Sequence, residues 1–195
     1  DEMKKVKEEV LSDIRQREDD AIQFTFIKFD EALFEGHPYS KDPTGNESDI
    51  QAIELNDLKT FYRHKLSPHN AVLAISGDVD EKKVEALFRK LFSGWTGQQN
   101  TFRRESATPR KKEVNIEKEL LQAHLVYGFL GPGLMDEDRN AAEVLDAILS
   151  GMGGRIHKIL REDRPYAYAL TFFNRMAYEI GEMGIYIGTD KKLAN

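Results

Sequence analysis

The chain has 195 residues, of which 40% are hydrophobic and 32% are charged; this balance excludes a disordered chain and allows one large domain or two small ones. Its formal net charge of -6 argues against nucleic-acid binding, which selects a basic surface. Cysteine is absent, which excludes disulfides and thiolate zinc sites, and no apolar run reaches the roughly 20 residues of a membrane span.

The first half of the chain is predicted to consist mainly of helices. Apolar side chains recur there with a period near 3.6 in four stretches. Asp19 or Asp20 can cap the second of these helices, and Gly36 can end it. Asp80 can cap the fourth. The predicted helices span residues 2–16, 19 or 20 to 36, 54–65 and 81–92, with a turn-rich loop at 37–48.

Strands are predicted mainly in the second half. The apolar run at 70–79 ends in a Gly-Asp turn, which is typical of a buried strand. Residues 94–112 are polar and without a period, as in a linker. Two strands, two helices and two strands are then predicted, at residues 113–119, 123–130, 136–149, 155–163, 166–176 and 183–189. This order favours an α+β two-layer sandwich, an antiparallel sheet covered by helices, over a parallel βαβ fold.

Three sequence segments follow one another in an informative order. The first runs from ALFEGHPY through SPHNAVLAISGDVD to LFSGW, within residues 32–95. The second is QAHLVYGFLGPG at 122–133, and the third is GMGGRIHKILREDRPYAY at 151–168. Each segment alone is a weak signal. Their joint order resembles the insulinase/pitrilysin-type zinc peptidases, the family that includes mitochondrial processing peptidase.

The resemblance implies a domain organisation and a set of partners. Members of that family have two similar α+β domains that close on an extended peptide, and an HxxEH helix in the first domain binds zinc. By this resemblance residues 1–95 are the back of a first domain, 96–112 a linker and 113–195 the front of a second, an excerpt of a longer protein. The expected partners are an unfolded or extended peptide and a catalytic peptidase chain or half, or a second copy in a homodimer. Neither nucleic acid nor a membrane span is expected.

The residues of a zinc site are missing from this sequence. It contains neither HxxEH nor the transposed motif, and no two of its five histidines stand three or four residues apart. By the resemblance, Asp13 occupies the position of the third ligand, a Glu whose side chain is one methylene longer. No metal is therefore expected in this chain, whereas zinc belongs to the family's catalytic chains.

The sequence thus favours a non-catalytic half that forms part of a peptide-binding chamber. Two alternatives stay open. One is an active zinc metalloendopeptidase whose HxxEH lies upstream, with Asp13 as a ligand. The other is a structural assembly subunit related to processing peptidase.

The stretch 151–168 supplies the candidate site residues. By the resemblance, Arg161 and Tyr168 reach the peptide carbonyls and the tetrahedral intermediate, where a guanidinium and a phenol stabilise negative charge on oxygen. The alternative is that Arg161 pairs with Glu162 or Asp163 and that Tyr168 is an ordinary strand residue.

Glycines and histidines are the remaining candidates. Gly153 and Gly154 are candidate substrate-binding residues in a glycine-rich loop, although such a cluster more often ends a helix and forms a turn. His37 is interpreted as a structural loop residue, and His124 as a satisfied histidine of a strand.

Overall fold

The structure is a computed structural model, and it describes residues 2–99, 105–108, 111–162 and 167–194. Its α-helices are α1 (Glu2–Asp19), α2 (Ala21–Leu33), α3 (Glu47–Ala52), α4 (Leu55–Lys65), α5 (Glu81–Phe92), α6 (Arg139–Leu149) and α7 (Arg155–His157). The short helical turns are η1 (Pro38–Ser40), η2 (Pro68–Asn70), η3 (Lys158–Glu162) and η4 (Lys191–Leu193). The strands are β1 (Ala123–Gly131), β2 (Ala169–Arg175) and β3 (Gly181–Thr189).

The strands form an antiparallel sheet in the order β1-β3-β2. Gly128 of β1 lies opposite Gly184 of β3. A Cβ at Gly184 would lie 2.7 Å from the Cα of Gly128, and a Cβ at Gly128 would lie 2.7 Å from the ring of Phe29. Real Cβ atoms do not approach other atoms so closely. The paired glycines therefore let α2 pack directly on the sheet.

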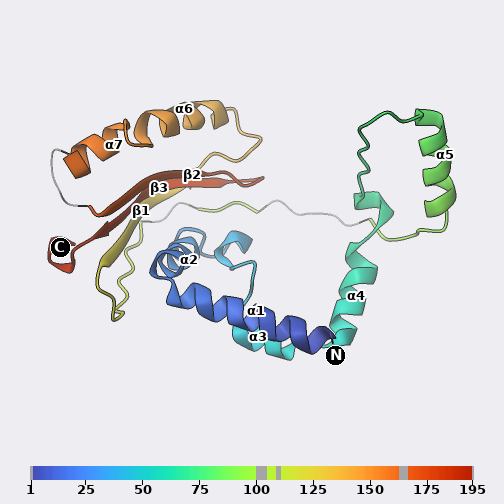
Figure 1. Ribbon diagram of the computed structural model, residues 1–195, viewed down its shortest axis with the longest axis horizontal. Helices are drawn as coiled ribbons and strands as arrows, with labels where there is room; N and C mark the ends of the chain where they lie inside the picture. Colours follow the sequence, from blue (N-terminus) through green and yellow to red (C-terminus); the bar gives the residue numbers. More distant parts are fainter. Residues whose placement is uncertain (1, 100–104, 109–110, 163–166, 195) are drawn as a thin grey trace.

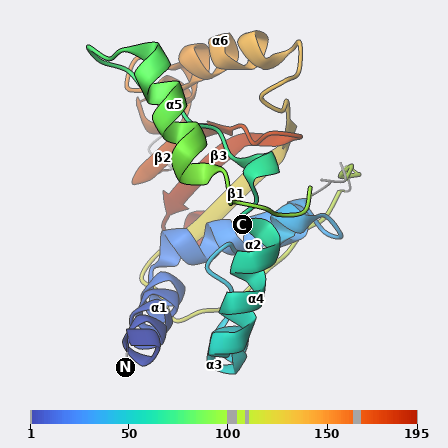
Figure 2. The same ribbon diagram turned by 90° about the vertical axis from the view of Figure 1, so that its right-hand side faces the viewer.

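Helices cover both faces of this sheet (Figure 1). On one face, the Phe26 ring of α2 lies 5.1 Å from the Phe173 ring and stacks 5.8 Å from the Tyr186 ring. On the other face, α6 and α7 contact β2. Figure 2 shows the same layers from the side, with α6 above the sheet and α2 and α1 below it. The predicted α+β fold with a helix-covered antiparallel sheet is confirmed.

The starts of α2 and α5 are set by the predicted caps. The Asp20 carboxylate accepts hydrogen bonds from the backbone N–H groups of Ile22 and Gln23, at 2.9 and 3.0 Å. These bonds lower the pKa of Asp20 below its ordinary value. Asp80 caps α5 in the same way, accepting from the Lys83 N–H at 3.1 Å. A carboxylate at this position satisfies donors that the helix leaves unpaired.

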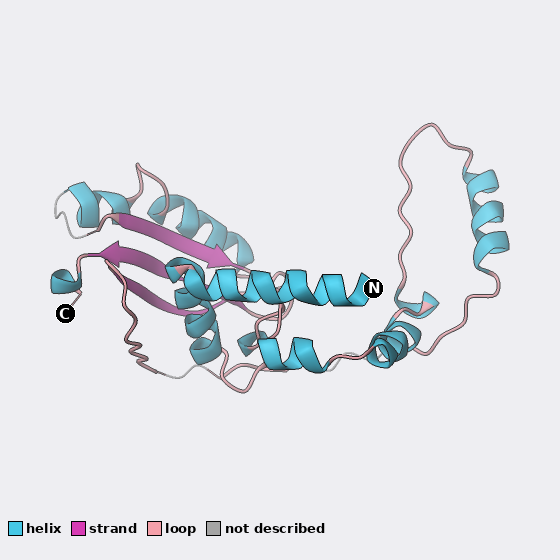
Figure 3. Ribbon diagram, turned by 60° about the horizontal axis from the view of Figure 1, so that its bottom comes forward, coloured by secondary structure: helices cyan, strands magenta, loops and turns pink. Residues whose placement is uncertain are grey.

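An extended arm consists of α4, α5 and the chain between them, and it stands apart from the sheet (Figure 1, Figure 3). The strand predicted at 70–79 lies in this arm, and that prediction is wrong: residues 71–79 form no strand, and Val72 is 94% exposed. A strand exists only through hydrogen bonds to a neighbour, and no described residue offers one here.

Other predictions around the sheet have mixed outcomes. Residues 113–119 form no strand, so that prediction is also wrong. The loop predicted at 37–48 contains η1 and the start of α3, a helix that the sequence analysis missed. Part of the predicted linker 96–112 lies outside the described residues, and the division into two domains stays a prediction. No helix among the described residues has the length and apolar character that a membrane crossing requires.

Candidate functional site

The glycine cluster forms the tight connection between α6 and α7. Ser150 ends α6, and Gly151 follows with φ +76°, a left-handed conformation that glycine adopts without a Cβ penalty. Gly154 is buried, and a Cβ there would lie 2.7 Å from the Leu149 carbonyl carbon. Gly153, in contrast, is exposed with open space where a Cβ would stand. The turn thus requires glycine at 151 and 154, whereas nothing in the fold requires it at Gly153.

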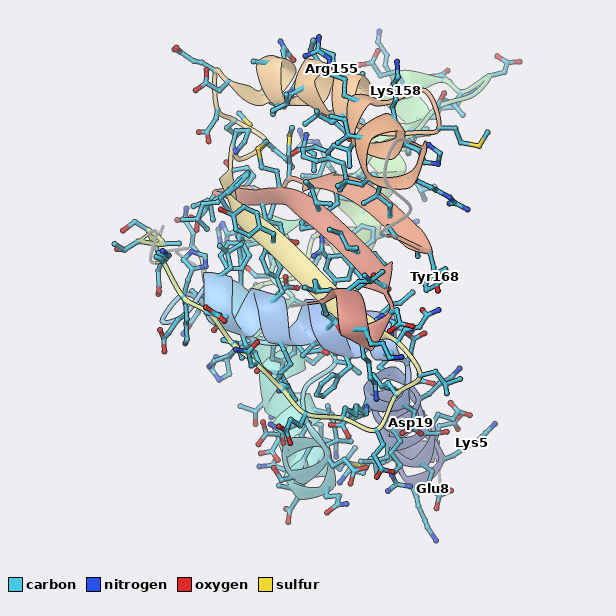
Figure 4. The ribbon with its side chains drawn as sticks, turned by 90° about the vertical axis from the view of Figure 1, so that its left-hand side faces the viewer. Lys5, Glu8, Asp19, Arg155, Lys158 and Tyr168 are labelled. Atoms are coloured by element: carbon cyan, nitrogen blue, oxygen red, sulfur yellow. The ribbon has the colours of Figure 1, made fainter. Side chains whose placement is uncertain are left out.

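Arg161 and Tyr168 are exposed on either side of residues 163–166, which lie outside the described residues. Arg161 belongs to η3, the turn that follows α7. Tyr168 is 63% exposed, and its backbone N–H donates to the Gly188 carbonyl at 2.9 Å, which holds it at the start of β2. In Figure 4, Arg155 and Lys158 stand in the α6–α7 layer, and Tyr168 lies between that layer and α1. Both candidate side chains are therefore accessible to a ligand.

The described residues do not fit a zinc site. Among them no group of three or more His, Cys, Asp or Glu side chains converges. Asp13 is exposed on α1, and the structure brings no histidine to it within such a group. Zinc requires three or four converging protein donors. No catalytic step that uses zinc can therefore be derived from these side chains.

His37 has a structural role in its loop. It is 3% exposed; its Nδ1 accepts from the Tyr39 N–H at 3.2 Å, so Nε2 carries the hydrogen and donates to the Glu105 carbonyl, also at 3.2 Å. His124 Nδ1 lies 2.7 Å from the Tyr186 hydroxyl at the sheet. Burial, and next the charge of Asp20, raise the pKa of Tyr186. These contacts agree with the structural interpretation of both histidines.

The sequence analysis missed a charge cluster made by Asp30, Arg175 and Glu182, in which Glu182 is buried, Asp30 is partly exposed and Arg175 is exposed. Arg175 Nη2 lies 2.5 Å from Glu182 Oε1 and 3.4 Å from Asp30 Oδ1. Burial, followed by the neighbouring Asp30 carboxyl, raises the pKa of Glu182 from 4.5 to about 8. Burial also raises the pKa of Asp30. The only signal in the sequence was a glutamate inside the apolar strand GEMGIYIGT.

Comparison with known proteins identifies relatives over nearly the whole chain. Residues 52–195 match the family profile described as "Peptidase M16 inactive domain". An uncharacterised zinc protease of Mycobacterium leprae is 28% identical over 196 residues, covering 95% of this chain and 43% of the relative. The chain thus spans less than half the length of this relative.

Solved structures show the same fold. A peptidase M16 inactive domain from Pseudomonas fluorescens superposes with a TM-score of 0.85 at 22% identity, covering 97% of this chain and 47% of that one. A chain of Complex III2 from Candida albicans superposes with a TM-score of 0.76 at 18% identity, covering 96% of this chain and 47% of that one.

Proposed function

The chain belongs to the peptidase M16 family through its match to the inactive domain, and from this premise we propose that it forms one wall of a peptide-binding chamber. In this proposal Arg161 and Tyr168 hold an extended peptide that a catalytic half or partner chain cleaves. Zinc is held by that catalytic part, since relatives bear the name zinc protease and the described residues of this chain present no zinc ligand set. The single observation that carries the proposal is the inactive-domain match.

The chemistry of the two exposed side chains supports peptide contact. A guanidinium offers five N–H donors and a phenol offers one O–H donor, and peptide carbonyls are acceptors. The exposed Gly153 and the turn glycine Gly154 stand beside α7, from which the chain continues into the turn of Arg161. In this proposal they let the peptide backbone approach that turn.

Strand β1 offers a second mode of contact. It is one edge of the sheet, since the order is β1-β3-β2, and its outer side has no strand partner among the described residues. An extended peptide can add to such an edge through backbone hydrogen bonds that do not depend on its sequence. This mode suits a protein that handles varied unfolded peptides.

The proposal includes the predicted division at residues 1–95, 96–112 and 113–195. The partner is a catalytic peptidase half or chain, or a second copy of this protein. The length of the relatives is consistent with further chain, because this chain covers 43% of the Mycobacterium leprae protein.

Peptide binding by the complete protein tests the proposal. A fluorescent unfolded peptide is titrated by anisotropy, with and without a chelator. We expect Arg161→Ala to weaken binding by about tenfold or more, because a charge-assisted hydrogen bond is lost, and Tyr168→Phe to weaken it several-fold. Lys158→Ala, which removes a neighbouring exposed cation of the same turn, is the control and leaves binding unchanged. Equal binding by all three variants would refute the role of Arg161 and Tyr168.

The same experiment distinguishes the two alternative functions from the proposed one. Chelator-sensitive cleavage, together with an HxxEH motif in the complete protein, supports the active metalloendopeptidase and contradicts the non-catalytic assignment. The fold shared with a chain of Complex III2 favours a structural assembly subunit as the second candidate. That candidate predicts a stable large assembly by mass photometry and no peptide binding.

A further inference from the structure

A cavity of about 520 Å³ opens between α2, the loop after η1 and the β2–β3 turn. Its size falls within the range of small-ligand sites, about 300–1,000 Å³. Tyr168 precedes the first residue of β2, and Arg175 is its last residue. At about 3.3 Å per residue the two lie roughly 20 Å apart. The cavity is therefore separate from the peptide-contact residues proposed above.

Two carboxyl groups that line this cavity share one guanidinium. Arg175 Nη2 lies 2.5 Å from Glu182 Oε1 and 3.4 Å from Asp30 Oδ1. The same guanidinium lies 4.5 Å from the ring centre of Phe26 and 5.2 Å from that of Phe173. Stacking on aromatic rings holds a guanidinium in place. Arg175 is thus held where its Nη2 contacts both the Asp30 and the Glu182 carboxyl groups.

Glu182 retains acceptor capacity that no described residue uses. The residue is 5% exposed, and its Oε2 is buried without a hydrogen-bond donor among the described residues. The other ion pair of the cavity, Arg17 with Asp42 at 2.9 Å, is balanced within itself. Buried acceptors are nearly always paired, and an unpaired one indicates a missing donor. The cluster of Asp30, Arg175 and Glu182 therefore carries one net negative charge when both carboxyls are ionised.

The lining of the cavity also includes the apolar residues Ile27, Phe34, Met176 and Ile180. A basic side chain combines a charged tip with a methylene stem that packs on apolar surface. We propose that this cavity binds the ammonium or guanidinium end of a basic group on a short apolar stem, with Glu182 Oε2 and Asp30 as the acceptors. A lysine or arginine side chain and a free alkylamine share this chemistry.

Binding of the cation displaces the proton of Glu182. With a pKa near 8, raised chiefly by burial, Glu182 is protonated at neutral pH when the cavity is empty. The charged and titratable groups that line the cavity together with Glu182 are Arg17 of α1, Asp30 of α2, Tyr39 of η1, Lys41 and Asp42 of the following loop, and Arg175 of β2. As the pH increases toward the pKa of Glu182, the affinity for the cation therefore rises by up to about tenfold per pH unit.

Probe binding to the complete protein, followed by NMR titration, tests the proposal. N-acetyl-lysinamide is compared with N-acetyl-norleucinamide, which keeps the stem and lacks the ammonium, and with n-pentylammonium. We expect both cations to bind at least about tenfold more tightly than the neutral amide, and more tightly at pH 7.5 than at pH 6. The tighter of the two cations identifies a side chain or a free amine as the occupant.

Variants separate this site from general electrostatics. Glu182→Gln reproduces the protonated form and so keeps the fold, and it removes both the preference for the cation and the pH dependence. Asp30→Asn weakens binding of the cation by about tenfold. Glu31→Gln, which removes the exposed neighbouring carboxylate of α2, leaves the affinity for the cation unchanged. Equal binding of the lysine and norleucine amides, or an unchanged preference in Glu182→Gln, would overturn the proposal.

Discussion

Raising the pH should destabilise this protein through Glu182, and Glu182→Gln should remove the effect. In the folded state the pKa of Glu182 is about 8, whereas the ordinary value is 4.5. The folded state thus holds a proton that the unfolded state releases between these values. The contribution to the free energy of unfolding is complete below pH 4.5, falls as pH rises, and is lost above about pH 8.

The magnitude follows from the proton linkage. Each pH unit between the two pKa values removes about 1.4 kcal/mol, so the interval from pH 6 to pH 8 removes up to about 3 kcal/mol. That is a large part of an ordinary folding stability of about 5–15 kcal/mol. The glutamine of Glu182→Gln does not titrate, so the free energy of unfolding of the variant lacks this pH-dependent contribution.

Urea unfolding at pH 6 and pH 9 measures the difference directly. Between pH 6 and pH 9, we expect the free energy of unfolding of the wild type to fall by about 2–3 kcal/mol more than that of the variant. A ¹³C NMR titration of the Glu182 carboxyl should give a midpoint near 8. A midpoint below about 5.5, or parallel loss of stability in both proteins, would refute the reasoning about burial and Asp30.

Three further predictions concern the fold and the metal. Asp20→Ala should lower the free energy of unfolding by about 1 kcal/mol in urea titrations, because two capping hydrogen bonds to α2 are lost; Asp19→Ala is the matched control and should be neutral. Gly128→Ala should cost about 1–3 kcal/mol, because its Cβ would overlap the Phe29 ring, and Phe29→Leu in the same protein should recover part of that loss. Elemental analysis of the 195-residue chain should find no stoichiometric zinc, and one bound equivalent would contradict the assignment of the metal to the catalytic part.

Local signals in the sequence predicted most of the helices and the starts of α2 and α5, although α3 was missed. Asp20 and Asp80 cap their helices as expected, because a cap depends on residues two or three positions away. The apolar run at 71–79 shows the limit of such signals. Its residues have strand character, yet a strand also needs a partner, and the described residues contain none for it.

Of the two proposed sites, only the one whose residues lie in a local motif could be proposed from the sequence, and the roles of its residues stay a prediction. The exposed Arg161 and Tyr168 lie in one continuous motif, and the motif also contains the turn that requires Gly151 and Gly154. The charge cluster could not be predicted, because Asp30 and Arg175 are 145 residues apart and meet only when α2 packs on the sheet. Neither residue belongs to a motif whose spacing indicates that contact.

The two proposed sites occupy opposite ends of one rigid strand, and this geometry makes them independent. Tyr168 and Arg175 are held by the same neighbour, β3, through continuous antiparallel pairing from Ala169 to Arg175. A change at one end reaches the other only if the whole register shifts, which would move every side chain of β2 to the opposite face. Since the separation is roughly 20 Å, the effects of distant substitutions should add. The double variant Tyr168→Phe/Glu182→Gln should therefore bind peptide as weakly as Tyr168→Phe alone. It should bind the cation as Glu182→Gln alone does. A coupling of more than about 0.5 kcal/mol between them would mean that the strand does not behave as a rigid link.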